Sequence, residues 1–369
     1  MLETNSTFLS VDLNALTHNL QFFKSRLGDE TKLLAVIKAF AYGHDAVGIA
    51  QRLEKEKVAY FAVAYIKEGI QLREAGIKTP ILVLHPQQSD LQACMSFNLE
   101  PNIYSFRMLK LIQEEIRLNK LSNFPIHLKF NTGLNRLGFV LEDVEKLIAI
   151  IKSDKTLKIA SVFSHLVASE DVNERSFTLK QIDLYKQIVA SIQAKYNDPF
   201  IKHLTNTSGT LNYPEAHFDM VRVGIGLYGY ANDLKYTSQL KNVGRLQSVI
   251  SQKHTIQKGD SVGYNRAFVA ERETISATIP IGHADGIPRT WSKGAGFVTI
   301  NGIKAPVLGN VCMDMIMVDV TTISCQEGDI VHIFDSQETL EEVAKNVGTI
   351  SYEILTAISQ RIPRVLKNR

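Results

Sequence analysis

Lys38 ends the first strongly apolar run of the sequence, which reads LLAVIKAFAYGHD. An ammonium group at the end of a buried strand has two interpretations. One is a lysine whose stem packs on apolar surface while its head reaches water. The other is a Schiff-base lysine, because the pKa of a lysine amine falls readily when the amine is desolvated. Lys38 alone does not decide between them.

Two later segments could hold a phosphate group. The segment NTSG (206–209) ends one apolar run, and RVGIG (222–226) lies in the next. Hydroxyl groups and glycine-exposed backbone N–H groups at such strand ends commonly bind phosphate. Each motif alone is weak, because turns use the same residues. Together with a strand-end lysine they indicate pyridoxal phosphate, with its aldehyde on Lys38 and its phosphate on these segments.

A repeating pattern of strands and helices would position these residues. Short apolar runs occur at 33–39, 60–65, 81–85, 100–105, 126–132, 159–165, 201–207 and 220–229, most of them separated by segments of helical periodicity. Apolar strands that alternate with helices indicate a parallel sheet. The number and size of the units match an α/β fold, a (β/α)8 TIM-type barrel over 12–232, whose functional residues lie at the C-terminal strand ends. A helix capped by Asp12 is expected at its start.

The pattern changes after about residue 232. Residues 274–281 alternate between apolar and polar, and Asn301-Gly302 is a type I′ hairpin signal between two strands. We expect a second, predominantly β domain over 233–369 that ends in a helix near 352–359. Residues 1–11 are expected to form a strand that packs with this domain.

Composition argues against several classes of protein. Lys and Arg total 41 against 38 acidic residues, a formal net charge of +3, and no basic block of the kind that binds nucleic acid is present. No stretch approaches the roughly 18 consecutive apolar residues of a membrane span. The three cysteines fit a reducing compartment, and the N-terminus lacks a secretory pattern, so we expect a cytoplasmic protein. No metal site is expected.

The lysine segment AVIKAFAYGHD resembles the pyridoxal-lysine signature of the alanine racemase family, usually seen as AVVKANAYGHG. HLKFNTGLNRLGF resembles that family's HLKVDTGMGRLG segment. Further motifs stand in family order at about family spacing: VFSHL, HLTNTSGTL, MVRVGIGLYG, GDSVGYNRAF, PIGHADGIPR, GNVCMD and TISYEILTAISQRIPR. The likeness crosses both expected domains. It implies a fold-type III pyridoxal-phosphate enzyme that interconverts L-alanine and D-alanine and supplies D-alanine for peptidoglycan.

The resemblance implies two residues that transfer protons. Lys38 would bind the cofactor and, once substrate has freed it, act as the base on one face of the amino acid. Tyr264, in GDSVGYN, would be the base on the other face. It would reach the active site of the other subunit, so that a homodimer shares its active sites. Without its motif, Tyr264 would be typical of packing in a core or an interface.

Arg222 is the most informative residue of the implied site. The equivalent arginine of the family hydrogen-bonds the pyridine nitrogen of the cofactor. A guanidinium group has no acceptor lone pair, so the ring nitrogen must accept and stays unprotonated. This weakens the ring as an electron sink and favours racemisation over decarboxylation or transamination. Without the flanking RVGIG, an arginine paired with an acid at the barrel rim would remain an open interpretation.

The resemblance assigns further roles. His165 would support Arg222, and Arg136 would hold the phenolic oxygen of the cofactor and the substrate carboxylate. Lys129 matches a position that several members carbamylate, a modification that sequence does not reveal. The remaining expected contacts are with the cofactor phosphate (Tyr42, Asn206, Thr207, Gly224, Ile225 and Tyr352), with the substrate from the partner subunit (the backbone N–H of Met313) and at the entrance (His283 and Arg289).

The chain departs from the family pattern at four positions. Asn131 replaces an Asp, Thr207 a Ser, His283 a Tyr and Asn310 an Arg. Thr207 keeps the hydroxyl group that a phosphate needs. The other three put the local charge balance and the entrance to the site in doubt.

Three alternatives to an alanine racemase stay open. The first is another enzyme of the fold, either a basic amino-acid decarboxylase, which Arg222 opposes, or a broader-specificity or serine racemase. The second is a non-catalytic pyridoxal-phosphate-binding protein, although such proteins lack a β domain with the equivalents of Tyr264 and Met313. The third is a regulator derived from a racemase, which an intact pair of Lys38 and Tyr264 opposes.

Overall fold

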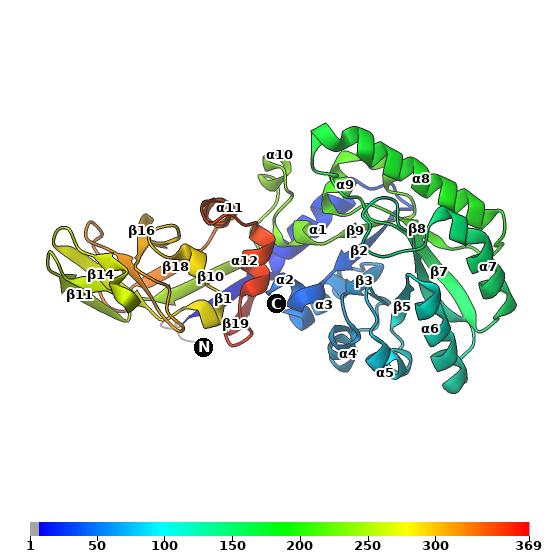
Figure 1. Ribbon diagram of the computed structural model, residues 1–369, viewed down its shortest axis with the longest axis horizontal. Coiled ribbons are helices and arrows are strands. Elements are labelled where there is room, and N and C mark those ends of the chain that lie inside the picture. The colour runs from blue at the N-terminus through cyan, green and yellow to red at the C-terminus, as the bar shows by residue number, and fades with distance from the viewer. Residues whose placement is uncertain (1–6, 369) are drawn as a thin grey trace.

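The computed structural model describes residues 7–368, which form two units (Figure 1). Residues 1–6 of the expected N-terminal strand and residue 369 lie outside the described residues. One unit is a closed barrel of parallel strands: β2 (Lys32–Val36), β3 (Tyr60–Val63), β4 (Ile81–Val83), β5 (Glu100–Ile103), β6 (Phe124–Lys129), β7 (Leu157–Phe163), β8 (Ile201–His203) and β9 (Met220–Val223). This confirms the barrel that the sequence predicts.

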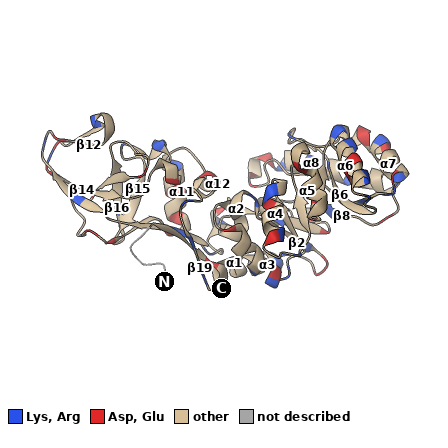
Figure 2. Cartoon of the chain, turned by 90° about the horizontal axis from the view of Figure 1, so that it is seen from below, with Lys and Arg blue, Asp and Glu red and all other residues tan. Residues whose placement is uncertain are grey.

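Helices cover the outside of the barrel (Figures 1 and 2). They are α1 (Leu13–Lys24), α3 (Ala46–Lys55), α4 (Ile66–Glu74), α5 (Leu91–Ser96), α6 (Phe106–Leu118), α7 (Val144–Ser153), α8 (Arg175–Gln193) and α9 (Thr207–Asn212). Helix α6 illustrates their design, because Ser105 caps it and Met108, Leu109, Ile112 and Ile116 bury one face at helical spacing. Figure 2 shows acidic and basic residues interspersed on the outer faces. Within residues 7–368, no helix combines the length and apolarity needed to cross a membrane.

The second unit is predominantly β, as the sequence predicts. Its nine-stranded sheet has the order β11-β14-β17-β16-β15-β18-β10-β1-β19. These strands are β1 (Phe8–Asp12), β10 (Gly244–Val249), β11 (Gln252–Ile256), β14 (Thr274–Ile279), β15 (Phe297–Ile300), β16 (Ile303–Leu308), β17 (Ile316–Asp319), β18 (Ile330–Phe334) and β19 (Arg364–Lys367). A separate pair consists of β12 (Ser261–Val262) and β13 (Phe268–Val269). The hairpin between β15 and β16 turns at Asn301 and Gly302, with φ of 50° and 78°, the signs that a type I′ turn requires.

Several segments join the two units, among them β1 and two C-terminal helices. Strand β1 pairs with β10 and β19 and runs directly into α1, with Asp12 as its cap. Helix α11 (Gln337–Asn346) begins with Gln337, whose side-chain amide donates to the carbonyls of Gly229, Thr237 and Leu240. Helix α12 (Ser351–Ala357) packs against α2 (Lys38–Tyr42), the segment that follows β2. The C-terminal unit therefore supports the loop that carries Lys38.

Candidate active site

A cavity of about 690 Å³ lies at the C-terminal ends of the barrel strands. It brings together the predicted site residues of the barrel and of α12: Lys38, Tyr42, Lys129, Arg136, His165, Asn206, Thr207, Arg222, Gly224, Ile225 and Tyr352. They come from different strands and loops of the barrel, and Tyr352 is contributed by α12. This is the end of a (β/α)8 barrel at which active sites are built.

The cavity is strongly cationic. Lys38, Lys129, Arg136 and Arg222 line it, and no Asp or Glu is among its described lining residues. Burial and the neighbouring Arg136 lower the pKa of Lys38, which gives its amine a larger neutral fraction. Burial, together with Arg222 and Arg136, lowers the pKa of Lys129 to about 7. Such a site suits an anionic ligand and contains two amines that can react as nucleophiles.

The backbone that follows Lys38 is left-handed. Residues 39–42 have φ of 53° to 55°, which crowds each Cβ against the next carbonyl oxygen at about 1–2 kcal/mol per residue. Hydrogen bonds hold this turn, from the Gly43 N–H to the carbonyl of Ala39 (2.9 Å) and from the Ala39 N–H to Glu68 Oε1 (2.6 Å). Strain of this kind collects at functional sites, where surrounding contacts fix it. The turn brings Lys38 and Tyr42 to the same cavity.

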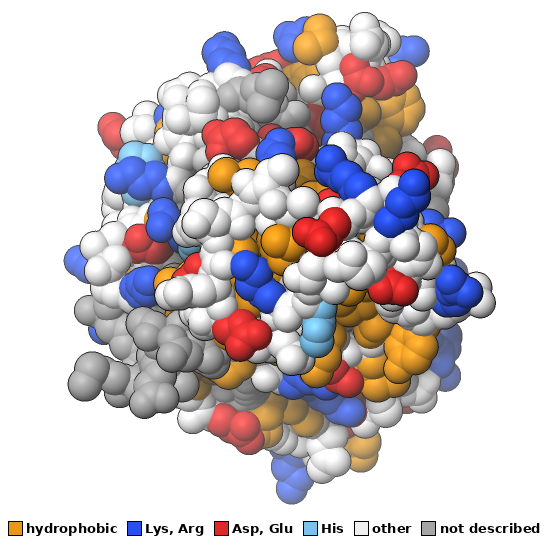
Figure 3. Space-filling model, turned by 90° about the vertical axis from the view of Figure 1, so that its left-hand side faces the viewer, with side chains coloured by type: hydrophobic (Ala, Val, Ile, Leu, Met, Phe, Trp, Pro, Cys, Tyr) orange, Lys and Arg blue, Asp and Glu red, His pale blue; other side chains and the backbone are white. Residues whose placement is uncertain are grey.

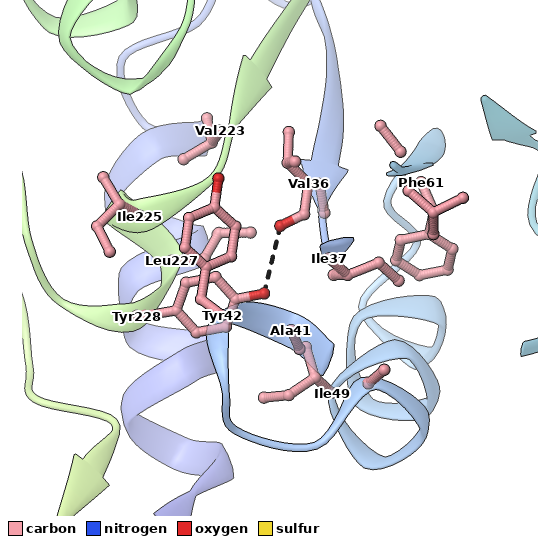
Figure 4. Close-up of a cluster of buried hydrophobic side chains, with 14 of the residues drawn as sticks. Val36, Ile37, Ala41, Tyr42, Ile49, Phe61, Val223, Ile225, Leu227 and Tyr228 are labelled. Atoms are coloured by element: carbon pink, nitrogen blue, oxygen red, sulfur yellow. Dashed lines mark hydrogen bonds between the residues drawn. The ribbon is translucent and has the colours of Figure 1, made fainter. Parts of the chain in front are cut away.

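Hydroxyl groups gather at one end of the cavity. Tyr42, Thr207, Ser208 and Tyr352 all line it. A Cβ on Gly224 would lie 2.4 Å from Tyr42 Oη, so only glycine lets this hydroxyl group approach the backbone there. Figure 4 shows Tyr42 beside the end of β9 and the segment that follows it. This set of hydroxyl and backbone groups fits a phosphate.

Arg222 also lines the cavity and is almost fully buried within a shell of acceptors. Its Nη2 donates to the carbonyls of Ser164 (2.6 Å) and Leu204 (2.9 Å) and to His165 Nδ1 (3.2 Å), whereas Nη1 donates to His203 Nδ1 (2.9 Å). Burial lowers the pKa of Arg222 to about 10, so the guanidinium stays charged at neutral pH. These contacts orient the guanidinium and prevent rotation of its plane. The contact with His165 is the one that the resemblance implies.

The predicted residues of the C-terminal domain lie elsewhere. Tyr264 and Met313 are 74% and 59% exposed, His283 and Arg289 are also exposed, and none of the four lines the barrel cavity. Hydrogen bonds link their segments, because Asn310 Nδ2 donates to the carbonyl of Tyr264 (3.2 Å) and the His283 N–H donates to that of Cys312 (2.9 Å). We call these residues, Tyr264, His283, Arg289, Asn310 and Met313, the C-terminal cluster.

The part of the C-terminal cluster that follows β12 lies far from the cavity of the same chain, whereas the segment that begins at His283 packs against the end of α12. Strand β12, which ends two residues before Tyr264, lies at the far side of the domain from the barrel (Figure 2). Figure 3 views the molecule from this side, where hydrophobic side chains reach the surface between charged ones. Within one chain, the cluster and the cavity therefore do not form one site.

Comparison with known proteins gives a consistent result. The family model for the alanine racemase N-terminal domain matches residues 11–232, and the model for the C-terminal domain matches residues 243–366. The alanine racemase of Sorangium cellulosum is 34% identical over 97% of this chain and 98% of its own length, and that of Synechocystis is 37% identical over 97% and 98%.

The chain belongs to the alanine racemase family.

Solved structures of family members share the whole architecture. The alanine racemase of Clostridium difficile superposes with a TM-score of 0.92 at 33% identity and covers 99% of this chain and 96% of its own. That of Bartonella henselae, with covalently bound pyridoxal phosphate, gives 0.88 at 30% identity over 98% and 99%. The enzyme from Bacillus anthracis with bound L-Ala-P gives 0.91 at 28% identity over 100% and 97%. The family is pyridoxal-phosphate dependent.

One departure from the family pattern has a structural explanation. Asn131 Oδ1 accepts from the N–H groups of Gly133 (3.1 Å) and Asn135 (2.9 Å), and its Nδ2 donates to Asn135 Oδ1 (2.8 Å). The amide therefore shapes the loop that leads to Arg136. A carboxylate could accept the same two N–H bonds but could not donate the third.

Sequence reasoning missed His203, which is buried and contacts Arg222 directly. It also missed Asn102 and Phe163, which line the cavity from β5 and β7. A signal for His203 was present, because a histidine interrupts the apolar run at 201–207. Such a residue is most often read as structural, and only its position beside Arg222 gives it a functional meaning.

Proposed function

We propose that this chain is an alanine racemase that interconverts L-alanine and D-alanine by two-base proton transfer, with pyridoxal phosphate attached to Lys38. The observation that carries the proposal is the cationic cavity, which is lined by both a partly buried lysine of lowered pKa, Lys38, and the buried guanidinium of Arg222. The bound cofactor would supply an electron sink that acidifies the α-C–H bond of the amino acid. Tyr42, Asn206, Thr207, Tyr352 and the backbone at 224–225 would hold its phosphate.

The residues of the chain would divide the remaining work. Arg136 lines the cavity and would bind the substrate carboxylate. Lys38 Nζ would remove or return the α-proton on one face. Arg222 can only donate hydrogen bonds, so a pyridine nitrogen placed against it would have to accept. This would keep charge from building up on the ring and would favour return of the proton, and hence racemisation.

Tyr264 would act on the opposite face from a second copy of the chain. Tyr264 and Met313 are exposed and do not line the cavity of their own chain. A two-fold dimer would bring the C-terminal cluster of each copy to the cavity of the other. His283 and Arg289 would then lie at the entrance, and the Met313 N–H would bind the substrate carboxylate.

The decisive experiment is incubation of the purified protein with L-alanine. D-alanine should accumulate to an equal mixture, measured by chiral chromatography, and borohydride should fix the cofactor on Lys38, located by peptide mass spectrometry. Lys38→Ala is the control and should form no D-alanine. L-serine tested beside alanine distinguishes an alanine racemase from a serine or broader-specificity racemase. A lysine-bound cofactor without racemisation would support the non-catalytic alternative instead.

We also propose that Lys129 is carbamylated. With a pKa of about 7, about half of its amine is neutral near pH 7, and it lies close to Arg222 and Arg136, which would stabilise an anion. Lys129 Nζ would attack the carbon of CO2, form an N–C bond and release one proton to water. ¹³C-bicarbonate should give one carbamate NMR signal, absent in Lys129→Arg. Absence of the signal from the unmodified sequence would reject the modification without affecting the racemase proposal.

The cellular role follows from the reaction. We expect the D-alanine that the reaction forms to be used for peptidoglycan. The three cysteines are free thiols, which fits the cytoplasm.

A further inference from the structure

Arg222 has a buried charge without an adjacent counter-charge. Its guanidinium contacts two carbonyls and two histidine nitrogens, and within residues 7–368 no carboxylate forms an ion pair with it. A buried charge is costly unless hydrogen bonds and a compensating charge stabilise it. The carbonyls and His165 account for Nη2. The partner of Nη1, His203, begins a longer chain of contacts.

A continuous series of hydrogen bonds runs through the barrel interior from Arg222 to Glu100. His203 Nδ1 lies 2.9 Å from Arg222 Nη1, and His203 Nε2 lies 2.7 Å from Ser161 Oγ. Ser161 Oγ lies 2.5 Å from His127 Nδ1, and His127 Nε2 lies 2.8 Å from Glu100 Oε2. His127, Ser161 and His203 are each 0% exposed. We call Glu100, His127, Ser161 and His203 the barrel relay.

Glu100, the anionic end of the relay, lies where a charged carboxylate has a small desolvation cost. Glu100 begins β5, at the N-terminal mouth of the barrel, and its side chain is 13% exposed. Tyr60 Oη donates a second hydrogen bond to Glu100 Oε2 (3.2 Å). Tyr60 lines a second cavity of about 530 Å³ at this mouth. The relay therefore connects the cationic cavity to a carboxylate near the other end of the barrel.

Arg222 fixes the direction of the hydrogens in the relay. A guanidinium can only donate, so His203 Nδ1 must accept and the hydrogen of the neutral ring lies on Nε2. Burial and the adjacent Arg222 lower the pKa of His203 well below its usual value, which keeps the ring neutral. Ser161 Oγ accepts a hydrogen bond from His203 Nε2 and donates its hydroxyl hydrogen in a hydrogen bond to His127 Nδ1. His127 then donates from Nε2 to Glu100, and every donor and acceptor is satisfied.

A break in strand register aligns the middle of the relay. The pairing of β6 with β7 shifts between Ile126 and His127, so that His127 is opposite Ser161. Lys129 and Phe163, two residues further along the same strands, pair with each other and line the cavity. Because side chains alternate along a strand, His127 and Ser161 also point into the barrel. The extra residue, Ala160, lies in β7, so the irregularity re-aims Ser161 toward His127, a known effect of bulges.

We propose that the barrel relay positions Arg222, with Ser161 as the link that transmits the negative charge of Glu100 to the guanidinium. This rests on the proposed function only for its catalytic consequence. Successive hydrogen bonds that all point the same way polarise one another, so a charge at one end strengthens the contacts at the other. Glu100, His127 and Ser161 are positioning residues, since none of them touches the cavity residues that would hold substrate except through His203.

The first test determines which histidine nitrogens carry a hydrogen, and it does not require enzymatic activity. In the full-length protein labelled with ¹⁵N-histidine, His127 and His203 should both be neutral, with hydrogen on Nε2 and none on Nδ1. Single His127→Gln and His203→Gln variants assign the signals. A doubly protonated His127, or hydrogen on His203 Nδ1, would overturn the relay, whether or not the protein racemises alanine.

The second test is a double-mutant cycle between Glu100, the charged end of the barrel relay, and Ser161, the link. Glu100→Gln keeps an acceptor for His127 but removes the charge, and should lower kcat for racemisation on the order of tenfold with little change in KM. In a Ser161→Ala background the same change should have an effect of less than about twofold, because the link is already broken. Ser161→Thr retains the hydroxyl group and should restore the sensitivity to Glu100→Gln.

A matched control separates the relay from general destabilisation. Ser248 is also a buried strand serine with one side-chain hydrogen bond, to Thr7 Oγ1 (2.7 Å), but lies in the C-terminal domain. Ser248→Ala should leave the Glu100→Gln effect unchanged. Additive effects of Glu100→Gln and Ser161→Ala on kcat would reject transmission through Ser161. If no variant or wild type racemises alanine, the proposed function fails and the histidine signals alone decide the relay.

Discussion

The barrel cavity and the C-terminal cluster differ in how their residues are held. In the cavity, Arg222 is nearly fully buried, and hydrogen bonds to strand carbonyls and histidines fix its position. In the cluster, Tyr264 and Met313 project from segments on a domain surface, 74% and 59% exposed. A catalytic side chain must be held rigidly to work. Under the proposed dimer, the barrel half of the site would be complete within one chain, whereas the other half would be completed by contact with a second copy.

The largest expected effect on racemisation comes from inactivating each half of the site in a different subunit. Lys38→Ala and Tyr264→Phe should each abolish almost all racemisation, because each removes one base from every site. When the two variants exchange subunits, half of the dimers are mixed, and each mixed dimer has one site with both bases. Racemisation should then recover to about a quarter of wild type, measured by D-alanine formation.

The exchange itself must be demonstrated, for example by native mass spectrometry of differently tagged subunits. Tyr264→Phe mixed with a second preparation of Tyr264→Phe is the control and should gain nothing. Absence of recovery despite exchange would mean that both bases belong to one chain, and would remove the explanation for the exposure of the C-terminal cluster.

A second prediction concerns the support of the barrel half by α12. A Cβ on Gly43 would lie 2.0 Å from the carbonyl oxygen of Leu355, and Gly43 has φ of +83°. Gly43→Ala should therefore lower the free energy of unfolding by more than about 3 kcal/mol. Gly76 has φ of +87° with open space around its Cβ position. Gly76→Ala should lower the free energy of unfolding only by the cost of the left-handed backbone, about 1 kcal/mol. Urea titrations of both variants measure the two effects. Equal effects of the two variants would show that contact with α12 is not what fixes the turn.

The site was only partly predictable from sequence. Lys38 and Arg222 could be found, because a barrel places the residues at its strand ends around one cavity. The left-handed turn at 39–42 could not, because Ala, Phe and Tyr have no preference for that conformation and Gly43 is the sole local hint. The barrel relay was also hidden, since its alignment depends on the register shift at His127. The fold class was predictable throughout, because the periodicity of apolar residues distinguishes the barrel from the β domain.

A third prediction uses the protonation of Lys129 in the barrel cavity. Its pKa is about 7 in the folded protein against an ordinary value of 10.5 in an unfolded chain, so the unfolded chain binds more protons between these values. The free energy of unfolding should therefore rise with pH through this window, by at most about 1.4 kcal/mol per pH unit for one proton. Lys129→Met should lack this contribution. Denaturant titrations in CO2-free buffer from pH 7.5 to 9 measure it, and parallel curves for the two proteins would contradict the lowered pKa.

The smallest effect is expected in the C-terminal cluster of a dissociated chain. Tyr264→Phe and Met313→Ala alter exposed side chains, and such changes usually affect stability by less than about 0.5 kcal/mol. Unfolding of dilute, monomeric protein should therefore be nearly unchanged, whereas the same Met313→Ala should weaken dimer formation, measured by sedimentation at increasing concentration. Met313→Leu keeps the apolar volume and should restore dimerisation. A clear loss of monomer stability in Tyr264→Phe would mean that Tyr264 already packs within its own chain, and the two halves of the site would then differ less than their exposure implies.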